Sequence, residues 1–141
     1  MRIPIKTIRV SVGKAGTETP TGTWTMHRAG RWQELMGPSW GQYGTHVVNG
    51  IFVHSVACGQ ANSYNLPVGE YLRLGNPASH GCIRACVADA KWVWDNCNGS
   101  KIHIFDGTYT SNEALKGPLG RKALTPLRGS KNFDPTDPAC K

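Results

Sequence analysis

The sequence predicts a single, mostly β domain with one main α-helix. Its 141 residues are enough for one hydrophobic core, and 39% of them are hydrophobic. The chain has 17 glycines and 9 prolines, residues that separate elements rather than fill them, which indicates many turns. Runs of β-branched residues lie between these turns, and one later stretch has the spacing of apolar residues that is typical of a helix.

The first part of the chain is predicted to form strands and tight turns. Residues 3–12 alternate partly between apolar and polar side chains and are rich in isoleucine and valine, which favours a strand. Residues 19–24, Thr-Pro-Thr-Gly-Thr-Trp, predict a turn that leads into a second strand, because Pro20 fixes φ and Gly22 adds conformational freedom. Residues 30–44 have no clear period, so we expect irregular structure with a short strand near Trp40.

The middle of the chain predicts a hairpin, a long loop and the main helix. Asn-Gly at 49–50, between the β-branched runs 45–48 and 51–55, is a strong hairpin signal that places His54 at a strand end. Residues 58–75 are polar and aperiodic, which predicts a long loop that serves as a lid. Apolar residues recur at spacings of three and four over 87–97, which predicts the helix, with Asp89 near its positive end. Residues 101–105 alternate as a strand.

The end of the chain has a different composition. Residues 116–141 are basic and rich in proline and glycine, and they contain few large apolar side chains. We therefore expect residues 1–115 to form the main domain. Residues 116–141 are expected to form a surface-hugging tail that is packed on this domain or extends from it.

The net charge of +7 favours anionic partners, but its sign does not choose among nucleic acid, a membrane surface and an acidic wall polymer. Nucleic acid is disfavoured, because the sequence has no run of five or more basic residues and no basic block interleaved with aromatic residues. Residues 1–14 have no apolar stretch long enough for a signal peptide or a transmembrane segment. This observation is consistent with a cytoplasmic protein and also with an excised domain that lacks its export signal.

The cysteines do not follow a metal-binding pattern. There are five, Cys58, Cys82, Cys86, Cys97 and Cys140, so at least one is unpaired if the others form disulfides, and their pairing is left open. Their spacing matches no zinc framework. A zinc site built from the thiol at 82 and two histidines is the metal alternative, but we expect no cofactor and no metal.

The chemistry is concentrated in residues 79–84, Ser-His-Gly-Cys-Ile-Arg. A thiol attacks as the thiolate, and cationic or hydrogen-bonding neighbours lower its pKa. Gly81 permits a tight turn and a close approach of a substrate carbonyl to main-chain amides. A cysteine nucleophile also needs a base. His80 shares the loop of the thiol, and His54 comes close to it if their strands are neighbours.

Each of these residues also has a plainer interpretation. His54 fits a partly buried histidine that is bonded to the backbone, and His80 fits a turn residue. Arg84 fits a solvated charge at a helix start, although a cation there opposes the helix dipole. Taken together with Cys82, they favour a catalytic site.

Taken together, these stretches resemble the YkuD-type catalytic domain of L,D-transpeptidases, which cross-link or trim bacterial peptidoglycan. The resemblance rests on residues 79–84, 52–55 and 19–24, with 89–92 similar to the start of the helix after the nucleophile, and covers roughly residues 10–105. It implies a β-sandwich of mixed sheets with the main helix after the nucleophile. The one or two strands usually found ahead of the turn at 19–24 are expected to be shortened or missing.

The resemblance also implies the catalytic roles. Cys82 would be the nucleophile and His54 the base that takes its proton, while Ser55 would orient the imidazole through its backbone carbonyl. Residues 1–115 would then be the catalytic domain.

Four further roles follow from the same resemblance. His80 and Gly81 would shape the oxyanion region together with the amide of the nucleophile. Arg84 would contact a substrate carboxylate or hold the floor of the site, and Ser79 would contact the substrate.

The implied reaction is ping-pong acyl transfer on peptidoglycan stem peptides. Cys82 would attack the carbonyl before a terminal D-amino acid, release that amino acid and form a thioester. An amine acceptor would complete a 3→3 cross-link, whereas water would give L,D-carboxypeptidase trimming; a catalytically silent wall-binding module is the alternative outside catalysis. The resemblance implies an extracytoplasmic location and acylation by carbapenem-type inhibitors. It leaves open the amino acids accepted, the dominant reaction and the oligomeric state.

Overall fold

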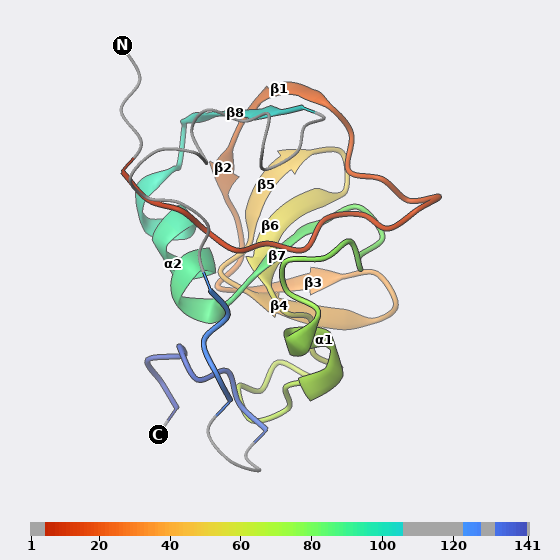
Figure 1. Cartoon of the computed structure of the whole chain (residues 1–141). Coiled ribbons are helices and arrows are strands. Elements are labelled where there is room, and N and C mark those ends of the chain that lie inside the picture. The colour runs from red at the N-terminus through yellow and green to blue at the C-terminus, as the bar shows by residue number, and fades with distance from the viewer. Residues whose placement is uncertain (1–4, 106–122, 128–131, 141) are drawn as a thin grey trace.

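The computed structural model describes residues 5–105, 123–127 and 132–140, and the predicted class is confirmed: the fold is mostly β with mixed sheets and one main helix (Figure 1). The elements in chain order are β1 (Gly22–Thr25), β2 (His27–Arg28), β3 (Trp32–Leu35), β4 (Ser39–Gln42), β5 (Thr45–Val48), β6 (Ile51–Ser55), α1 (Val68–Leu72), β7 (Ile83–Ala85), α2 (Val87–Asn96) and β8 (Lys101–Ile104).

The central sheet has the strand order β2-β5-β6-β7. The predicted hairpin is confirmed: β5 and β6 are antiparallel, and Asn49 in their turn has φ of 49°, which asparagine tolerates better than most residues. β6 and β7 are parallel, and a parallel pair needs a long crossover, here residues 56–82. This pairing places residue 54 on β6 directly beside residue 84 on β7.

Two smaller antiparallel sheets flank the central one. β1 pairs with β8, and β3 pairs with β4. The short strand expected near Trp40 is confirmed as β4, but the irregular structure expected for the rest of 30–44 was wrong, because β3 and β4 form a hairpin with Gly37 in its turn at φ of 116°. The two buried residues of β4 are Gly41 and the polar Gln42, and the other residues of both strands are half-buried or exposed with little apolar alternation, so the pattern that reveals a strand with one buried face was absent.

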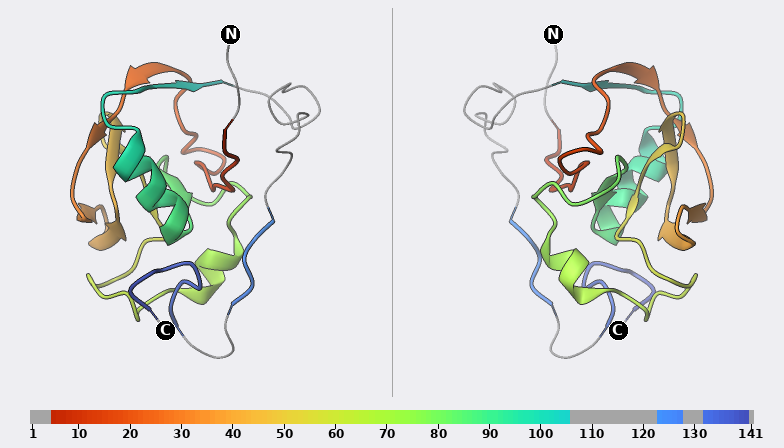
Figure 2. Two further views of the ribbon diagram at one scale, coloured as in Figure 1. Left: turned by 90° about the vertical axis from the view of Figure 1, so that its left-hand side faces the viewer. Right: turned by 90° about the vertical axis from the view of Figure 1, so that its right-hand side faces the viewer.

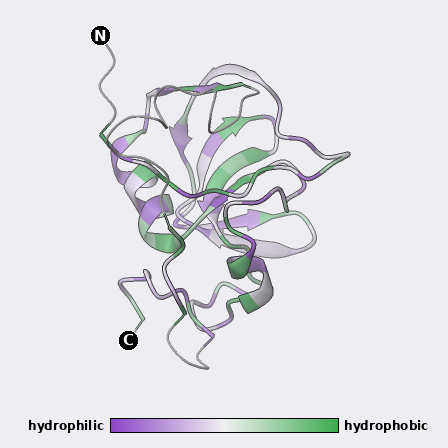
Figure 3. Ribbon diagram, in the orientation of Figure 1, coloured by the Kyte–Doolittle hydropathy of each residue, from purple (hydrophilic) through white to green (hydrophobic). Residues whose placement is uncertain are grey.

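The main helix is confirmed over Val87–Asn96, and it packs against β6 on one face of the central sheet (Figure 2). Hydrophobic residues gather on the central strands in Figure 3. The first core cluster joins buried side chains of the sheet and the helix: Met26, Val47, Val53, Ile83 and Val93.

The strand predicted over residues 3–12 was wrong for the described part, 5–12. This segment is extended, but with Gly13 it makes only isolated bridges, Ser11 to Arg84 and Gly13 to Ser79. Its alternating residues Ile8, Val10 and Val12 still pack on the core, which explains the strand-like pattern. Within residues 5–21, no strand longer than a bridge precedes β1.

The loop expected over 58–75 has more structure than its composition suggests. It contains α1, and Leu66, Tyr71 and Leu74 are buried in a second core cluster with Val56 and Cys86. The prediction of a structureless loop that serves as a lid is therefore wrong for residues 58–75, because half of the large apolar residues in this segment form part of the core.

The described parts of the C-terminal region also pack on this second cluster. Leu124 and Leu127 lie against it, and Phe133 is 2% exposed. The buried carboxylate of Asp134 accepts a hydrogen bond of 2.9 Å from the N–H of Val87 and so caps α2 from a distance in sequence. Residues 132–140 are thus more deeply integrated than a surface-hugging tail. The division at residue 115 falls within 106–122, outside the described residues, and stays a prediction.

No helix in the described part of the chain combines the length and the apolar composition needed to cross a membrane.

Candidate active site

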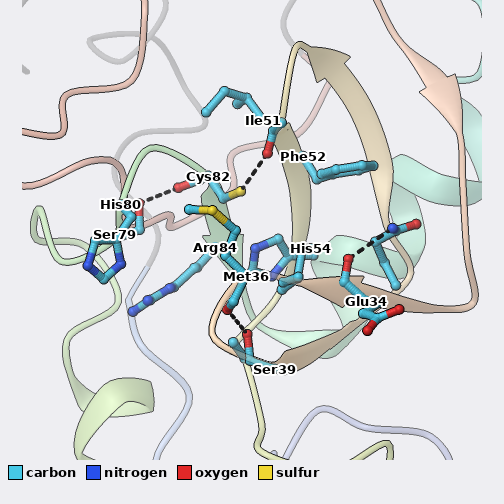
Figure 4. A pocket seen from close by; sticks show the side chains of 14 residues that line it. Glu34, Met36, Ser39, Ile51, Phe52, His54, Ser79, His80, Cys82 and Arg84 are labelled. Carbon is cyan, nitrogen blue, oxygen red and sulfur yellow. Dashed lines mark hydrogen bonds between the residues drawn. The ribbon is translucent and has the colours of Figure 1, made fainter.

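A cleft of about 640 Å³ opens between the β3–β4 hairpin, β6 and the loop before β7 (Figure 4). Of the residues predicted for the site, it brings together His54, Ser79, His80, Cys82 and Arg84. One wall comes from residues that sequence reasoning missed: Gln33, Glu34, Leu35, Met36 and Ser39 of the β3–β4 hairpin. The sequence contained only one indication of this wall, the lack of an apolar period in residues 30–44. A hairpin that lines a cleft does not need one face of buried apolar residues.

Cys82 lies at the end of the loop that leads into β7. Its thiol faces the backbone carbonyl of Gly50, with Sγ 3.5 Å from that oxygen. Burial raises the pKa of the Cys82 thiol, and the opposing effects of the Phe52 backbone and the Arg84 charge do not offset this. Neighbouring groups lower this pKa as expected, but burial outweighs them, so the expected net decrease is wrong. The resting group is a neutral thiol, so attack requires a base.

His54 on β6 is 1% exposed and is positioned by the backbone. Its Nδ1 lies within hydrogen-bond distance of the carbonyl oxygen of Ser55. A carbonyl can only accept, so Nδ1 carries the proton and Nε2 keeps its lone pair. Burial lowers the pKa of His54 to about 4, the hydrogen bond to Ser55 opposes this, and the Arg84 charge adds to it. At neutral pH the imidazole is thus a neutral acceptor.

Ser55 contributes its carbonyl to this arrangement, as the resemblance implied. Its hydroxyl has a different task, since it accepts a hydrogen bond of 2.8 Å from the backbone N–H of Gln42 on β4. Ser55 therefore ties β6 to β4 and fixes the backbone that orients His54.

The loop around Ser79 is held by its own hydrogen bonds. The Ser79 hydroxyl donates to the carbonyl of Cys82 at 2.6 Å and accepts from the N–H of Gly81 at 3.1 Å. Ser79 is 1% exposed, so this hydroxyl holds the loop rather than making the expected substrate contact. The Gly81 N–H is occupied, whereas the Cys82 N–H has no acceptor in the described part of the chain and is available as an oxyanion donor. His80 is exposed at the rim of the cleft.

Arg84 lies within β7, so the interpretation of this residue as a solvated charge at a helix start is wrong. Its Nη1 is 2.8 Å from a carboxylate oxygen of Glu70 on α1, and its side chain is 14% exposed. The pair connects the floor of the cleft to α1. This position fits the expected role at the floor of the cleft, whereas the expected contact with a substrate carboxylate stays a prediction.

Gly41 on β4 is a further site residue that the sequence did not indicate. A Cβ atom built on Gly41 would lie 2.7 Å from Nδ1 and 2.9 Å from Cγ of His54, closer than real contacts allow. The backbone of β4 therefore forms the surface on which the imidazole rests, and only glycine leaves that space.

We expect Gly41→Ala to lower the free energy of unfolding by about 1–3 kcal/mol, because the added methyl group overpacks the buried imidazole. Urea denaturation measures this change. The matched control is Gly69→Ala in α1, where an added Cβ meets nothing within 4 Å, and stability should stay equal or rise. Equal effects of the two substitutions would contradict the contact between Gly41 and His54.

A metal site has no support in the described residues, which contain no group of three or more His, Cys, Asp and Glu side chains arranged to hold an ion.

A cysteine and a histidine oriented by a third group, both in one cleft, are typical of cysteine-dependent acyl transfer. The chain belongs to the L,D-transpeptidase catalytic domain family, YkuD, whose model matches residues 2–117.

Solved structures of L,D-transpeptidases share this fold. One from Mycobacterium tuberculosis is 23% identical with a TM-score of 0.55, covering 70% of this chain and 42% of that one. One from Stackebrandtia nassauensis is 21% identical with a TM-score of 0.51, covering 69% and 42%. LdtMt1, solved with imipenem, is 24% identical with a TM-score of 0.53, covering 72% and 49%.

Among curated proteins, YciB of Bacillus subtilis, provisionally named an L,D-transpeptidase, is 59% identical over 27 residues. The match covers 19% of this chain and 14% of YciB, and the chain spans less than half the length of each solved structure above.

Proposed function

We propose that this chain is a peptidoglycan L,D-transpeptidase domain that acts through a thioester on Cys82. One observation carries the proposal: a neutral His54 with its tautomer fixed by Ser55 shares a cleft with a protonated thiol. A general base is needed where the thiol is neutral, and the buried imidazole is in the form that accepts a proton.

The proposed reaction has two steps. In the first, Nε2 of His54 takes the thiol proton while Sγ of Cys82 attacks the carbonyl of a tetrapeptide stem. The collapsing intermediate expels the terminal D-amino acid, whose amine takes the proton from His54, and leaves the thioester. In the second step, an acceptor amine attacks the thioester carbonyl and gives its proton to Nε2 of His54. The C–S bond then breaks, the departing Sγ takes that proton from His54, and the thiol is restored as the 3→3 cross-link forms.

The substrate class is supported by charge and by the relatives. The net charge of +7 suits an anionic wall polymer, and a stem carboxylate would compete with Glu70 for Arg84. LdtMt1 is described in complex with imipenem, which supports the proposal that a carbapenem acylates Cys82 here. We propose an extracytoplasmic site of action, where this substrate is found.

The test is incubation with a disaccharide tetrapeptide and mass analysis of the products. We expect a cross-linked dimer and one released D-amino acid for each dimer formed. A tripeptide product without dimer would instead favour L,D-carboxypeptidase trimming. Unchanged substrate, with a protein that gives a cooperative unfolding transition, would favour the catalytically silent wall-binding module.

The pH dependence of acylation follows from the state of His54. Its pKa of about 4 means that the imidazole stays neutral well below pH 6.5, so acylation should persist to about pH 5 and fall as the pH approaches 4. The initial rate of carbapenem adduct formation, measured from pH 4 to 8, checks this. A fall centred near pH 6.5 would show that His54 titrates as in water.

Stability should show the same titration. Because the pKa of His54 is lower in the folded chain than in the unfolded chain, the unfolded state binds the proton first as the pH falls. The free energy of unfolding should therefore fall from about pH 6.5 to 4. In His54→Gln this fall should be smaller, which separates His54 from the buried Asp134, whose pKa is raised.

A further inference from the structure

The segment from Ser11 to Thr19 runs beside the nucleophile loop and is bonded to it along its length (Figure 1). Ser11 and Arg84 exchange two backbone hydrogen bonds, of 2.9 and 2.8 Å. The carbonyl of Ser79 accepts from the N–H of Lys14 and from the hydroxyl of Thr17, each at 2.9 Å. We call residues 11–19 the strap. It supports the loop from the side opposite the pairing of β7 with β6.

Thr19 makes the contact nearest to the reacting thiol. Its hydroxyl accepts a hydrogen bond from the N–H of Gly13 at 2.9 Å and donates to the carbonyl of Gly81 at 2.7 Å. The acceptor bond fixes the rotation of the hydroxyl, so its single proton points at Gly81. A Cβ on Gly13 would lie 2.0 Å from the carbonyl oxygen of Thr17, so the strap closes tightly on itself behind Thr19.

The carbonyl of Gly81 and the N–H of Cys82 belong to one peptide group. A trans peptide is planar, and its C=O and N–H point in opposite directions. A bond that fixes the direction of the Gly81 carbonyl therefore also fixes the direction of the Cys82 N–H. No residue in the described part of the chain accepts a hydrogen bond from this N–H, whereas the Gly81 N–H is bonded to Ser79.

The conformation of Gly81 makes such a bond necessary. Gly81 has φ of 129°, which few residues other than glycine adopt, and glycine gives the peptide that follows it the most freedom to rotate. The Ser79 hydroxyl holds the two neighbouring groups, the Gly81 N–H and the Cys82 carbonyl. The Gly81 carbonyl lies between these two groups in the chain, and Thr19 holds it by a hydrogen bond.

We infer that Thr19 is a positioning residue that aims the Cys82 N–H at the oxyanion of the tetrahedral intermediate. The inference rests on the proposed function, because an oxyanion forms only when Cys82 attacks a carbonyl. Thr19 does not touch the substrate. It sets the orientation of the Cys82 amide, whose N–H has no acceptor in the described part of the chain.

Two reactions of the same thiol separate this role from general support of the loop. Acylation by a carbapenem forms an oxyanion on the β-lactam carbonyl, which the Cys82 N–H stabilises. Alkylation by iodoacetamide joins Sγ to a methylene carbon, expels iodide and forms no oxyanion. Both reactions require loss of the thiol proton, so a change in thiol reactivity affects both, whereas a misdirected N–H affects acylation alone.

We expect Thr19→Val to slow acylation by about 10- to 100-fold, less than the complete loss of an oxyanion donor. The rate of iodoacetamide alkylation of Cys82 should stay within about 2-fold of wild type. Thr19→Ser retains the hydroxyl and should restore acylation to within about 3-fold. Stopped-flow absorbance for acylation and peptide mass analysis for alkylation measure the two rates on the full chain.

Two further variants serve as controls. Thr17→Val removes another strap hydroxyl, but its acceptor, the Ser79 carbonyl, keeps the bond from Lys14 and does not share a peptide with Cys82, so acylation should slow by less than about 3-fold. Thr21→Val, at an exposed position in the same turn, should leave both rates unchanged.

The outcomes distinguish this inference from the proposed function. If wild type is not acylated, the proposed function fails and the inference falls with it. If wild type is acylated but Thr19→Val reacts at the same rate, the inference alone is overturned. It is also overturned if Thr19→Val slows acylation and alkylation by the same factor, because the hydroxyl would then act on the thiol or on the whole loop.

Discussion

Replacing Cys82 with alanine is expected to abolish acylation by a carbapenem and the formation of cross-linked product, while the fold is retained. The other cysteines cannot substitute for the lost thiol. Cys58, Cys86 and Cys140 are buried, and burial raises the pKa of each of these thiols. Intact-mass analysis after incubation with a carbapenem should show one adduct on wild type and none on Cys82→Ala.

Cys97→Ala is the matched control for this experiment. Cys97 is partly exposed at the C-terminal end of α2, outside the residues that line the cleft, so its replacement should leave the adduct in place. An adduct on Cys82→Ala would refute the assignment of the nucleophile. Because the side chain of Cys82 is not among the core residues, Cys82→Ala should unfold at a urea concentration similar to that of wild type.

Replacing His54 with alanine is expected to slow acylation by at least ~10²-fold, the usual contribution of a general base. The reason is specific to this site: burial keeps the Cys82 thiol protonated at rest, so few molecules react without a proton acceptor. Stopped-flow measurement of acylation at pH 7 checks the rate. His54→Gln preserves most of the side-chain volume, and should be equally slow if the loss is chemical rather than a result of the cavity.

His80 provides the comparison for the base, since it was the nearest alternative in sequence. His80 is exposed, at the rim of the cleft, and is not tied to a backbone carbonyl by any bond among the described residues. His80→Ala should therefore reduce acylation by less than about 10-fold. Near-normal rates in His54→Ala together with a large loss in His80→Ala would transfer the role of base to His80.

The sequence was most informative where a feature depends on neighbours along the chain. The hairpin at Asn49 was predictable because it depends on two turn residues between two apolar runs. The helix over Val87–Asn96 was predictable because its apolar spacing is local. Both predictions also placed site residues, since the hairpin positions His54 at the end of β6 and the helix begins just after β7.

The roles of the polar groups around the thiol were less predictable. Ser79 was expected to contact substrate, but its hydroxyl is buried and bonds within the loop. Gly81 was expected to help form the oxyanion region, but its N–H is bonded to that hydroxyl. Sequence adjacency places these groups near the thiol, yet it does not say which of them already has a partner.

The sequence by itself determined the class of fold, the order of the main elements and the segment 79–84 that holds the nucleophile, because each depends on residues close together in the chain. Only the tertiary structure decided the protonation of Cys82 and His54, the support of the imidazole by Gly41 and the β3–β4 wall of the cleft. These properties depend on burial and on contacts through space. Burial raises the pKa of a thiol that its sequence neighbours alone would lower, and no local pattern reports how deeply a residue lies in the folded chain.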